Sequence, residues 1–266
     1  MVSAIGSDNK LASYQFEVIE EGEIPDSAIY RWKLDDVASG TVTDSIGSAD
    51  GTVNGVSSVS GDYQGGSAGD GDGTDDHILT GTLGDFGSNI TTDFALAFTV
   101  DNFDEGTDTT DDYAMGLIST GQSGNTRFEL LFSTDNKGDV LLILTDASEN
   151  SYQVATDSGG HIDGNNQVRV LVNKVENSGD DGIEIYVAAK GDTSYTEVAS
   201  SVRADIDDGL SDGEDFTHDF ALFASNDAGT PRRHANTTFD DIIIYADSLD
   251  STQRQADLDE QPAFGS

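Results

Sequence analysis

Short runs of alternating apolar residues recur along this chain, and they restrict its fold more than any other feature of the sequence. In residues 94–100, Phe94, Leu96, Phe98 and Val100 occupy every second position, which places all four on one face of an extended strand. The same period of two recurs in residues 167–174 and 182–189. Further candidate strands are residues 28–34, 76–80, 113–119, 127–133, 139–145, 152–156, 219–225 and 239–246.

The segments between these runs are turns rather than helices. Clusters of Gly, Asp, Ser and Asn, such as residues 134–139 and 176–182, are typical of the turns of β-hairpins. One short helix is expected after the last strand, capped by Asp250 or Ser251 and ended by Pro262. Many strands without interleaved helices predict an all-β, two-sheet sandwich. Its predicted core contains Trp32, Phe94, Leu96, Phe98, Val170, Val172, Ile183, Ile185, Ile242 and Ile244.

The charge of the chain is extreme, because 51 acidic residues against 12 Lys and Arg give a formal net charge of −39. Such a surface repels phosphates, which excludes sequence-independent nucleic-acid binding. In dilute salt it would also repel itself, whereas at molar salt the screening length falls to about 3 Å. The alternating apolar runs argue against disorder. We therefore predict a protein of an extreme halophile.

The composition and the amino-terminal residues exclude further classes. The chain has no cysteine, so disulfides, thiolate metal sites and cysteine nucleophiles are absent. No apolar run is long enough for a membrane helix, which excludes insertion by a helix. The first ten residues, MVSAIGSDNK, show neither the basic flank nor the apolar centre of a signal peptide.

Five segments lie in an order that resembles a known family. They are AIYRWKLDD, TVTDSIGSADGTVNG, YQGGSAGDGDGTDDHILT, NNQVRVLVNKVENSGDDGIEIYV and TFDDIIIYADSLDSTQRQADL, which together span the chain from Ala28 to Leu258. Their order and spacing are similar to those of the laminin-G-like, concanavalin-A-like jelly roll. The resemblance implies an antiparallel jelly-roll sandwich over residues 28–266, preceded by an arm over residues 1–27.

The resemblance also implies a structural cation, held near the Asp-x-x-Gly…Asp-Gly loop and the final Asp-Asp strand. In this sequence the matching residues are Asp44, Asp50 and Asp241, with backbone carbonyls completing the oxygen cage. Ca²⁺ suits such ligands, and Mg²⁺, Na⁺ or K⁺ are alternatives at high salt. The same aspartates could equally be three of many that solvate a halophilic surface. Residues 69–77, GDGDGTDDH, are a second candidate for a cation site. The resemblance offers an alternative without a metal, because the family has a Gly-x-Asp-Asp motif where the chain enters a strand.

Catalysis finds little support in the sequence. A retaining glycosidase of this fold needs two carboxylates at alternate positions of one strand, and the Glu-x-Asp-x-x-Glu pattern does not occur. None of the histidines stands in a convincing Ser/His/Asp order. We predict that the protein is not an enzyme.

One loop before the last strand stands out for its positive charge. Arg232, Arg233 and His234 follow Pro231 and hold two of the twelve basic residues of the chain. In a protein of charge −39 this placement indicates a counter-charged target, either an acidic subunit or a carboxylated or sulfated glycan. The alternative is a loop that only neutralises its own surroundings.

The arm contains one strand-like segment, residues 14–21, whose Phe16, Val18 and Ile19 give it an apolar face. A strand that precedes a closed sandwich must pair with something, so we expect it to anchor the protein to a sister subunit or to a capsid or tail protein. A homo-oligomer follows from the first case. The competing account adds this strand to the chain's own sheet.

These observations lead to three functional hypotheses. The preferred one is a non-catalytic structural or attachment protein on the virion surface of a halophile virus, as a decoration, turret, spike or tail-associated protein that recognises glycans or a host surface. It reconciles an exterior module with the missing signal peptide. The alternatives are an extracellular or cell-surface carbohydrate-binding module and, third, a glycoside-active enzyme.

Overall fold

The computed structural model of the protein describes residues 4–5, 11–12, 23–83, 93–104, 115–121, 127–133, 139–145, 151–156, 167–175, 181–203, 219–227 and 229–264. These residues form β-strands, two short 3-10 helices and one α-helix, so the prediction of an all-β protein is confirmed. No helix in this part of the chain is both long and apolar enough to cross a membrane.

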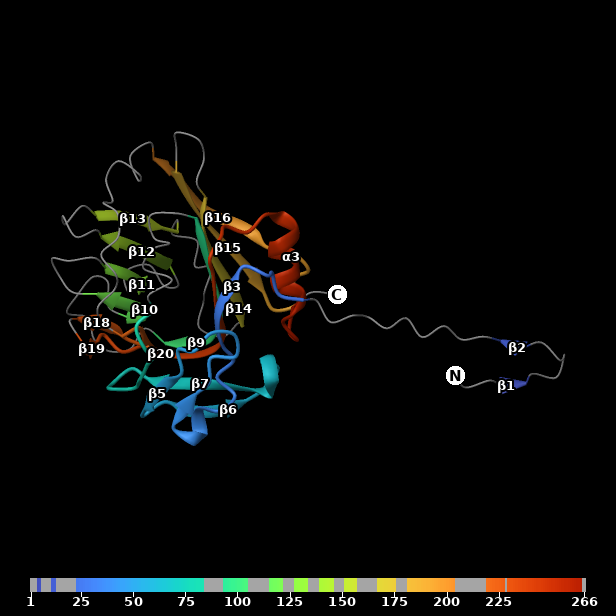
Figure 1. Cartoon of the computed structure of the whole chain (residues 1–266), viewed down its shortest axis with the longest axis horizontal. Coiled ribbons are helices and arrows are strands. Elements are labelled where there is room, and N and C mark those ends of the chain that lie inside the picture. Colours follow the sequence, from blue (N-terminus) through green and yellow to red (C-terminus); the bar gives the residue numbers. More distant parts are fainter. Residues whose placement is uncertain are drawn as a thin grey trace.

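Two antiparallel sheets form the body of the molecule (Figure 1). The first, called the β9 sheet, runs in the order β16 (Thr196–Arg203), β15 (Asp181–Ala189), β14 (Val168–Val175), β9 (Phe94–Asp104), β20 (Asn236–Tyr245), β7 (Ser67–Asp72) and β6 (Ser57–Ser60). A further strand, β3 (Ala28–Trp32), pairs with β20.

The second sheet, called the β11 sheet, packs against the first. Its order is β13 (Ser151–Ala155), β12 (Asp139–Thr145), β11 (Arg127–Ser133), β10 (Met115–Gly121), β17 (Ala221–Leu222), β8 (His77–Leu79), β5 (Gly51–Asn54) and β4 (Thr41–Val42). Strands that are distant in sequence, such as β10 and β17, are neighbours in it. Two antiparallel sheets with such crossed connections confirm the predicted jelly-roll sandwich.

Smaller elements connect or flank the sheets. Two 3-10 helices, η1 (Val37–Ser39) and η2 (Gln64–Gly66), lie in loops. A hairpin is formed by β18 (Ser225–Asp227) and β19 (Thr230–Arg232). In the arm, β1 (Ala4–Ile5) pairs with β2 (Leu11–Ala12) and with neither large sheet. The predicted strand 14–21, with Phe16, Val18 and Ile19, lies outside the described residues.

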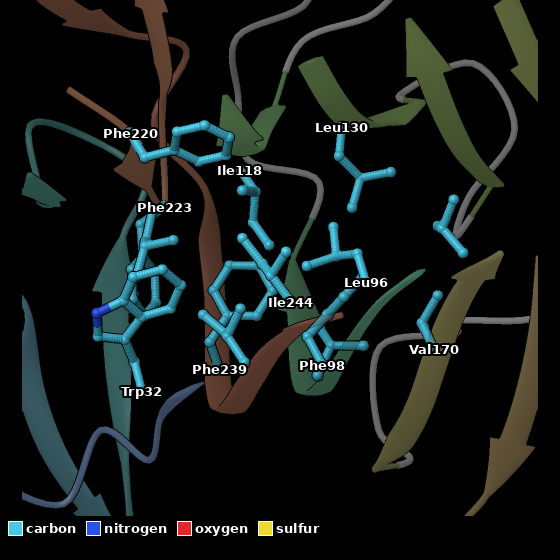
Figure 2. Close-up of a cluster of buried hydrophobic side chains, with 14 of the residues drawn as sticks. Trp32, Leu96, Phe98, Ile118, Leu130, Val170, Phe220, Phe223, Phe239 and Ile244 are labelled. Carbon is cyan, nitrogen blue, oxygen red and sulfur yellow. The ribbon is translucent and has the colours of Figure 1, made fainter. Parts of the chain in front are cut away.

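One continuous hydrophobic core fills the space between the sheets (Figure 2). Trp32 has no exposed surface, and its indole N–H donates to the carbonyl of Ala49 at 2.7 Å. Phe98 and Phe239 meet edge to face with ring centres 5.8 Å apart. All ten predicted core residues are fully buried, namely Trp32, Phe94, Leu96, Phe98, Val170, Val172, Ile183, Ile185, Ile242 and Ile244.

The predicted carboxy-terminal helix is α3 (Ser251–Asp259), which lies on the outer face of the β9 sheet (Figure 1). Asp250 caps it, because its carboxylate accepts the backbone N–H groups of Thr252 and Gln253. The side chain of Gln253 in turn accepts the N–H of Asp250, which completes a capping box. Leu258 and Phe264 form a small apolar cluster with β15 and fix the helix to the sheet.

The prediction of a single strand over residues 219–225 is wrong. The structure divides this segment, because Phe223 adopts a left-handed φ of 66° between β17 and β18. The turn buries the Phe223 ring against Phe239, with ring centres 4.7 Å apart. Packing of this aromatic side chain therefore outweighs the period-two pattern, and the chain after it leaves the sheet as the β18–β19 hairpin.

Candidate functional site

The loop predicted to hold a cation is built around the carboxylate of Asp44. Its Oδ1 accepts the backbone N–H groups of Arg31, Ile46 and Gly47 at 2.9–3.1 Å, and its Oδ2 accepts that of Ala49 at 3.0 Å. A Cβ atom added to Gly47 would lie 2.5 Å from Oδ2, so the glycine of the motif is needed to close the loop. Four backbone donors therefore solvate this carboxylate where the chain turns.

The other two predicted ligands lie in different surroundings. Asp50 is next to Asp44, whose N–H donates to its Oδ1 at 2.9 Å. Asp241 is fully buried, and its Oδ1 accepts a hydrogen bond from Nε of Arg31 at 2.6 Å. Its Oδ2 lies 3.5 Å from Nη2 of Arg169. Among the described residues, these three aspartates do not form one group of mutually close ligand atoms. A cation at this loop stays a prediction.

Asp241 belongs to a buried ionic network that fastens α3 to the β9 sheet. Arg169 and Asp257 are both fully buried and form two hydrogen bonds, Nε–Oδ2 at 3.1 Å and Nη2–Oδ1 at 2.7 Å. The hydroxyls of Tyr195 and Tyr245 also donate to the Asp257 carboxylate, at 2.6 and 2.7 Å. Burial by itself would raise the pKa of Asp257, but the guanidinium and these donors hold that pKa below its ordinary value.

The basic loop predicted as a binding site lies at the end of the β18–β19 hairpin. Arg232 is the last residue of β19 and is exposed. Arg233 follows with a left-handed φ of 52°, and its side chain is 39% exposed. Its Nη1 lies 3.6 Å from Oε1 of Glu129, a buried carboxylate on β11. The turn at Arg233 therefore joins the hairpin to the outer face of the β11 sheet.

Two further contacts hold this hairpin in place. The hydroxyl of Ser225 donates to Oε1 of Glu129 at 2.7 Å, and the N–H of Asn226 donates to Oγ of Ser119 at 2.6 Å. Ser119 and Glu129 are cross-strand neighbours on β10 and β11. Both contacts therefore hold the hairpin to the same part of the β11 sheet. We call this region the hairpin surface and define it as the exposed Arg232 and Arg233 together with the buried Ser119, Glu129 and Asn226 beneath them.

Apolar side chains continue the hairpin surface along the outer face of the β11 sheet. Ile143 lies opposite Glu129, and Leu141 lies opposite Leu131 in the next register position on that face. These three apolar residues form a buried cluster separate from the main core. Basic, acidic and apolar groups thus follow one another across the same strands.

His234, which the sequence grouped with these arginines, contacts a second cluster of residues. Its Nδ1 lies 2.9 Å from the carbonyl oxygen of Asp76, and its ring centre lies 5.7 Å from that of His77. The carboxylates of Asp72, Asp75 and Asp76 are within 4.8 Å of one another. Burial raises the pKa of Asp76, and the charges of the other two carboxylates raise it further. This is the segment 69–77 that the sequence also marked as cation-friendly.

A carboxylate that the sequence did not indicate is Asp240, beside Asp241 on β20. It is 1% exposed, its Oδ2 accepts the backbone N–H of Gln64 at 2.6 Å, and its Oδ1 has no hydrogen-bond partner among the described residues. Burial and then the neighbouring charge of Asp241 raise its pKa to about 8. Only the fold reveals this environment, because Asp240 reads as one of many surface aspartates in the sequence.

Comparison with known proteins finds structures of similar fold but assigns the chain to no family. No family model matches the sequence, and neither does any curated protein sequence. The binding domain of Paraclostridial Mosquitocidal Protein 1 superposes with a TM-score of 0.62 at 13% identity, covering 86% of this chain and 51% of that one. The receptor-binding domain of botulinum neurotoxin mosaic serotype C/D gives 0.58 at 14% identity, covering 87% and 50%.

The binding domain of botulinum neurotoxin serotype G is similar to the same extent. Its TM-score is 0.55 at 13% identity, and the match covers 87% of this chain and 50% of that one. The present chain thus spans about half the length of the toxin domains that it matches. At these identities the likeness concerns the β-sandwich fold.

Proposed function

We propose that this protein is a non-catalytic recognition module that binds an anionic ligand through its hairpin surface. The observation that carries the proposal is the position of Arg232 and Arg233, two of twelve basic residues in a chain of net charge −39, on a hairpin anchored by Glu129 and Ser119. An anchored hairpin loses little conformational freedom when a ligand binds. Guanidinium groups suit carboxylates and sulfates because they donate paired hydrogen bonds.

Two further points support binding rather than catalysis. The toxin fragments with the same fold are described as binding or receptor-binding domains. In addition, the buried carboxylates Asp241 and Asp257 are ion-paired with arginines inside the fold, where they have no exposed surface to offer a substrate. The ligand class we favour is a carboxylated or sulfated glycan, with an acidic protein as the second candidate.

Binding to immobilised glycans in molar salt tests this proposal. The variant Arg232→Gln leaves the contact of Arg233 with Glu129 in place, so it should lose most of its binding to carboxylated or sulfated glycans and keep its melting temperature within a few degrees. Lys190→Gln is the matched control, since Lys190 is a half-exposed cation that follows β15, outside the hairpin, and pairs with exposed Asp62 at 2.9 Å. Equal binding by both variants, or equal binding of neutral and anionic glycans, would refute the assignment.

We further propose that the module works on the outside of a halophile virus particle. The proposal rests on the net charge of −39, which suits a protein that works in molar salt. Co-purification with particles tests this location. A secreted carbohydrate-binding module is the alternative, and it predicts glycan binding by the isolated monomer without any particle. Polysaccharide turnover by the purified protein would instead favour a glycoside-active enzyme.

The arm is proposed to tie the module to sister subunits or to a capsid protein. Ile24 already packs against the outer face of the β9 sheet, so the deletion that tests anchoring should stop before it. Removal of residues 1–22 should give a folded monomer, as measured by light scattering in molar salt. An oligomer of unchanged size, or a truncated chain that no longer folds, would count against an anchoring role.

A further inference from the structure

Two histidines from distant parts of the chain lie beside each other. His77 begins β8, and His234 lies in the loop between β19 and β20. Their ring centres are 5.7 Å apart, with an angle of 47° between the ring planes. Both residues are partly exposed, so the space beside the rings is open to solvent and to small solutes.

The hydrogen bonds of these rings determine which nitrogen carries the proton. Nδ1 of His77 lies 2.8 Å from the carbonyl oxygen of Asp75, and Nδ1 of His234 lies 2.9 Å from that of Asp76. A carbonyl oxygen only accepts, so both Nδ1 atoms must donate. In each neutral ring Nε2 then carries a lone pair. Metal-binding histidines commonly show this arrangement, with the other ring nitrogen donating to a carbonyl.

We propose that His77 and His234 bind one divalent transition-metal ion through their Nε2 atoms, with water completing its coordination. Metal–nitrogen bonds of about 2.0–2.1 Å place the centres of two ligating imidazoles roughly 5–6 Å apart. The observed 5.7 Å separation of the two ring centres agrees with this geometry. Both histidines adjoin strands of the sandwich, so the separation is maintained by the fold.

The charges around the pair favour a cation. Asp72, Asp75 and Asp76 gather their carboxylates on the loop that also supplies both carbonyl partners. Arg233, next to His234 in the sequence, has its guanidinium 3.6 Å from the buried Glu129 carboxylate on β11. The Asp76 carboxylate is close enough to His234 for the two charges to interact, so the acidic loop favours a cation at the pair.

The imidazoles decide which cation is bound. Oxygen ligands suit Ca²⁺ and Mg²⁺, whereas imidazole suits Ni²⁺, Cu²⁺ and Zn²⁺. In molar NaCl, abundant monovalent ions screen and occupy carboxylate sites, but they do not compete for an imidazole lone pair. The histidine pair should therefore still prefer transition-metal ions over Na⁺ and K⁺ in molar salt. This inference is independent of anion binding by Arg232 and Arg233.

Titration of the full chain with Ni²⁺ in molar NaCl, followed by calorimetry, tests the site. We expect one Ni²⁺ per chain, with binding weakened roughly tenfold or more in either His77→Gln or His234→Gln. The control variant carries His161→Gln and His218→Gln, the remaining two histidines of the chain, and should bind as the unmutated protein does. An excess of Ca²⁺ should not displace the Ni²⁺.

A measurement on the unmutated protein avoids dependence on folded variants. Paramagnetic Ni²⁺ should broaden the imidazole NMR signals of two histidines and leave those of the other two sharp. Undiminished Ni²⁺ binding when His77 and His234 are both replaced would overturn the proposal. Displacement of Ni²⁺ by Ca²⁺ would do the same, because it would assign the metal to the carboxylates of Asp72, Asp75 and Asp76.

Discussion

At the scale of single residues, the stability of this protein depends on charges that the fold has removed from water. Arg169 and Asp257 have no exposed surface, and each compensates the charge of the other. Burying a single charge is costly, and the paired geometry with two tyrosine donors offsets that cost. Removing one partner of this pair should therefore cost much more free energy than removing an exposed charge.

Asp257→Ala should destabilise the fold by about 3–5 kcal/mol, because it removes the carboxylate that forms two hydrogen bonds with the buried Arg169 and leaves it only Asp241, which Arg31 also pairs with. Chemical denaturation in molar salt measures the change in the free energy of unfolding. Asp259→Ala is the matched control, since Asp259 lies on the same helix, is exposed and accepts a hydrogen bond only from Gln255 among the contacts described. A loss for Asp257→Ala no larger than for Asp259→Ala would show that water reaches Arg169.

Asp240 should make stability fall as pH rises. Its pKa is about 8 in the folded protein, above the ordinary value of 3.8, so the folded state binds more protons than the unfolded state between those values. Stability from this group is complete below about pH 4 and is lost as the pH rises through about 8. Relative to the unmutated protein, Asp240→Asn should therefore gain stability by a few kcal/mol between pH 4 and pH 8. Parallel pH curves of the two proteins would contradict this expectation.

At the scale of elements, the core strands and the helix were predictable because their signals are local. Phe94–Val100 alternates over a full strand, and Asp250 precedes a helix that Pro262 follows. The edge strands β6 and β16 were not predicted, since each has one polar face and few apolar residues. The split at Phe223 was also missed, because it depends on the Phe239 ring from another strand.

The candidate site was only partly predictable for a similar reason. The Arg232-Arg233 cluster is visible as a charge anomaly, and the segment 69–77 as an acidic run. Their meeting through His77 and His234 depends on contacts between residues 158 positions apart, such as that of His234 with Asp76. The same holds for Asp257, which lies 88 positions from Arg169. A single sequence shows residue types but not which distant residues are neighbours.

Phe98→Ala on β9 should cost about 3–5 kcal/mol, as a large-to-small change at a fully buried position. The lost contacts include the edge-to-face packing on Phe239. Urea or guanidinium unfolding of both proteins at one salt concentration gives the difference. Ile46→Ala provides the control, because Ile46 is 41% exposed and should cost little. A cost below about 1 kcal/mol for Phe98→Ala would contradict the burial of this side chain between the two sheets.

The Asp44 loop yields a prediction that separates its two roles. Asp44→Ala removes the acceptor of four backbone N–H groups and should destabilise the protein by about 2–4 kcal/mol with or without Ca²⁺. If a cation also binds beside Asp50, a chelator should lower the melting temperature of the unmutated protein and leave that of the variant unchanged. The comparison requires fixed ionic strength. An equal melting temperature of the unmutated protein with chelator and with Ca²⁺ would eliminate the cation.

At the scale of the whole molecule, salt acts strongly on the acidic surface and hardly at all on the buried ion pairs. The surface charge of −39 gives long-range repulsion that favours expansion of the chain. Pairs such as Arg169 with Asp257 lie in the interior, where dissolved ions hardly screen them. Salt should therefore relieve the repulsion between surface carboxylates while leaving the pairs that hold α3 in place intact.

The free energy of unfolding should accordingly rise as NaCl or KCl is increased from millimolar to molar concentrations. The screening length falls from about 10 Å at 0.1 M to about 3 Å at 1 M, and the repulsion between surface carboxylates falls with it. Thermal unfolding across this range measures the effect, and a series in sucrose at matched osmolality controls for exclusion of solute from the surface. The self-association proposed above should tighten over the same range, because two surfaces of like charge approach each other more easily when screened. A fold that is equally stable at low and at molar salt would contradict the halophilic interpretation, since the repulsion would then be too weak to have shaped the composition.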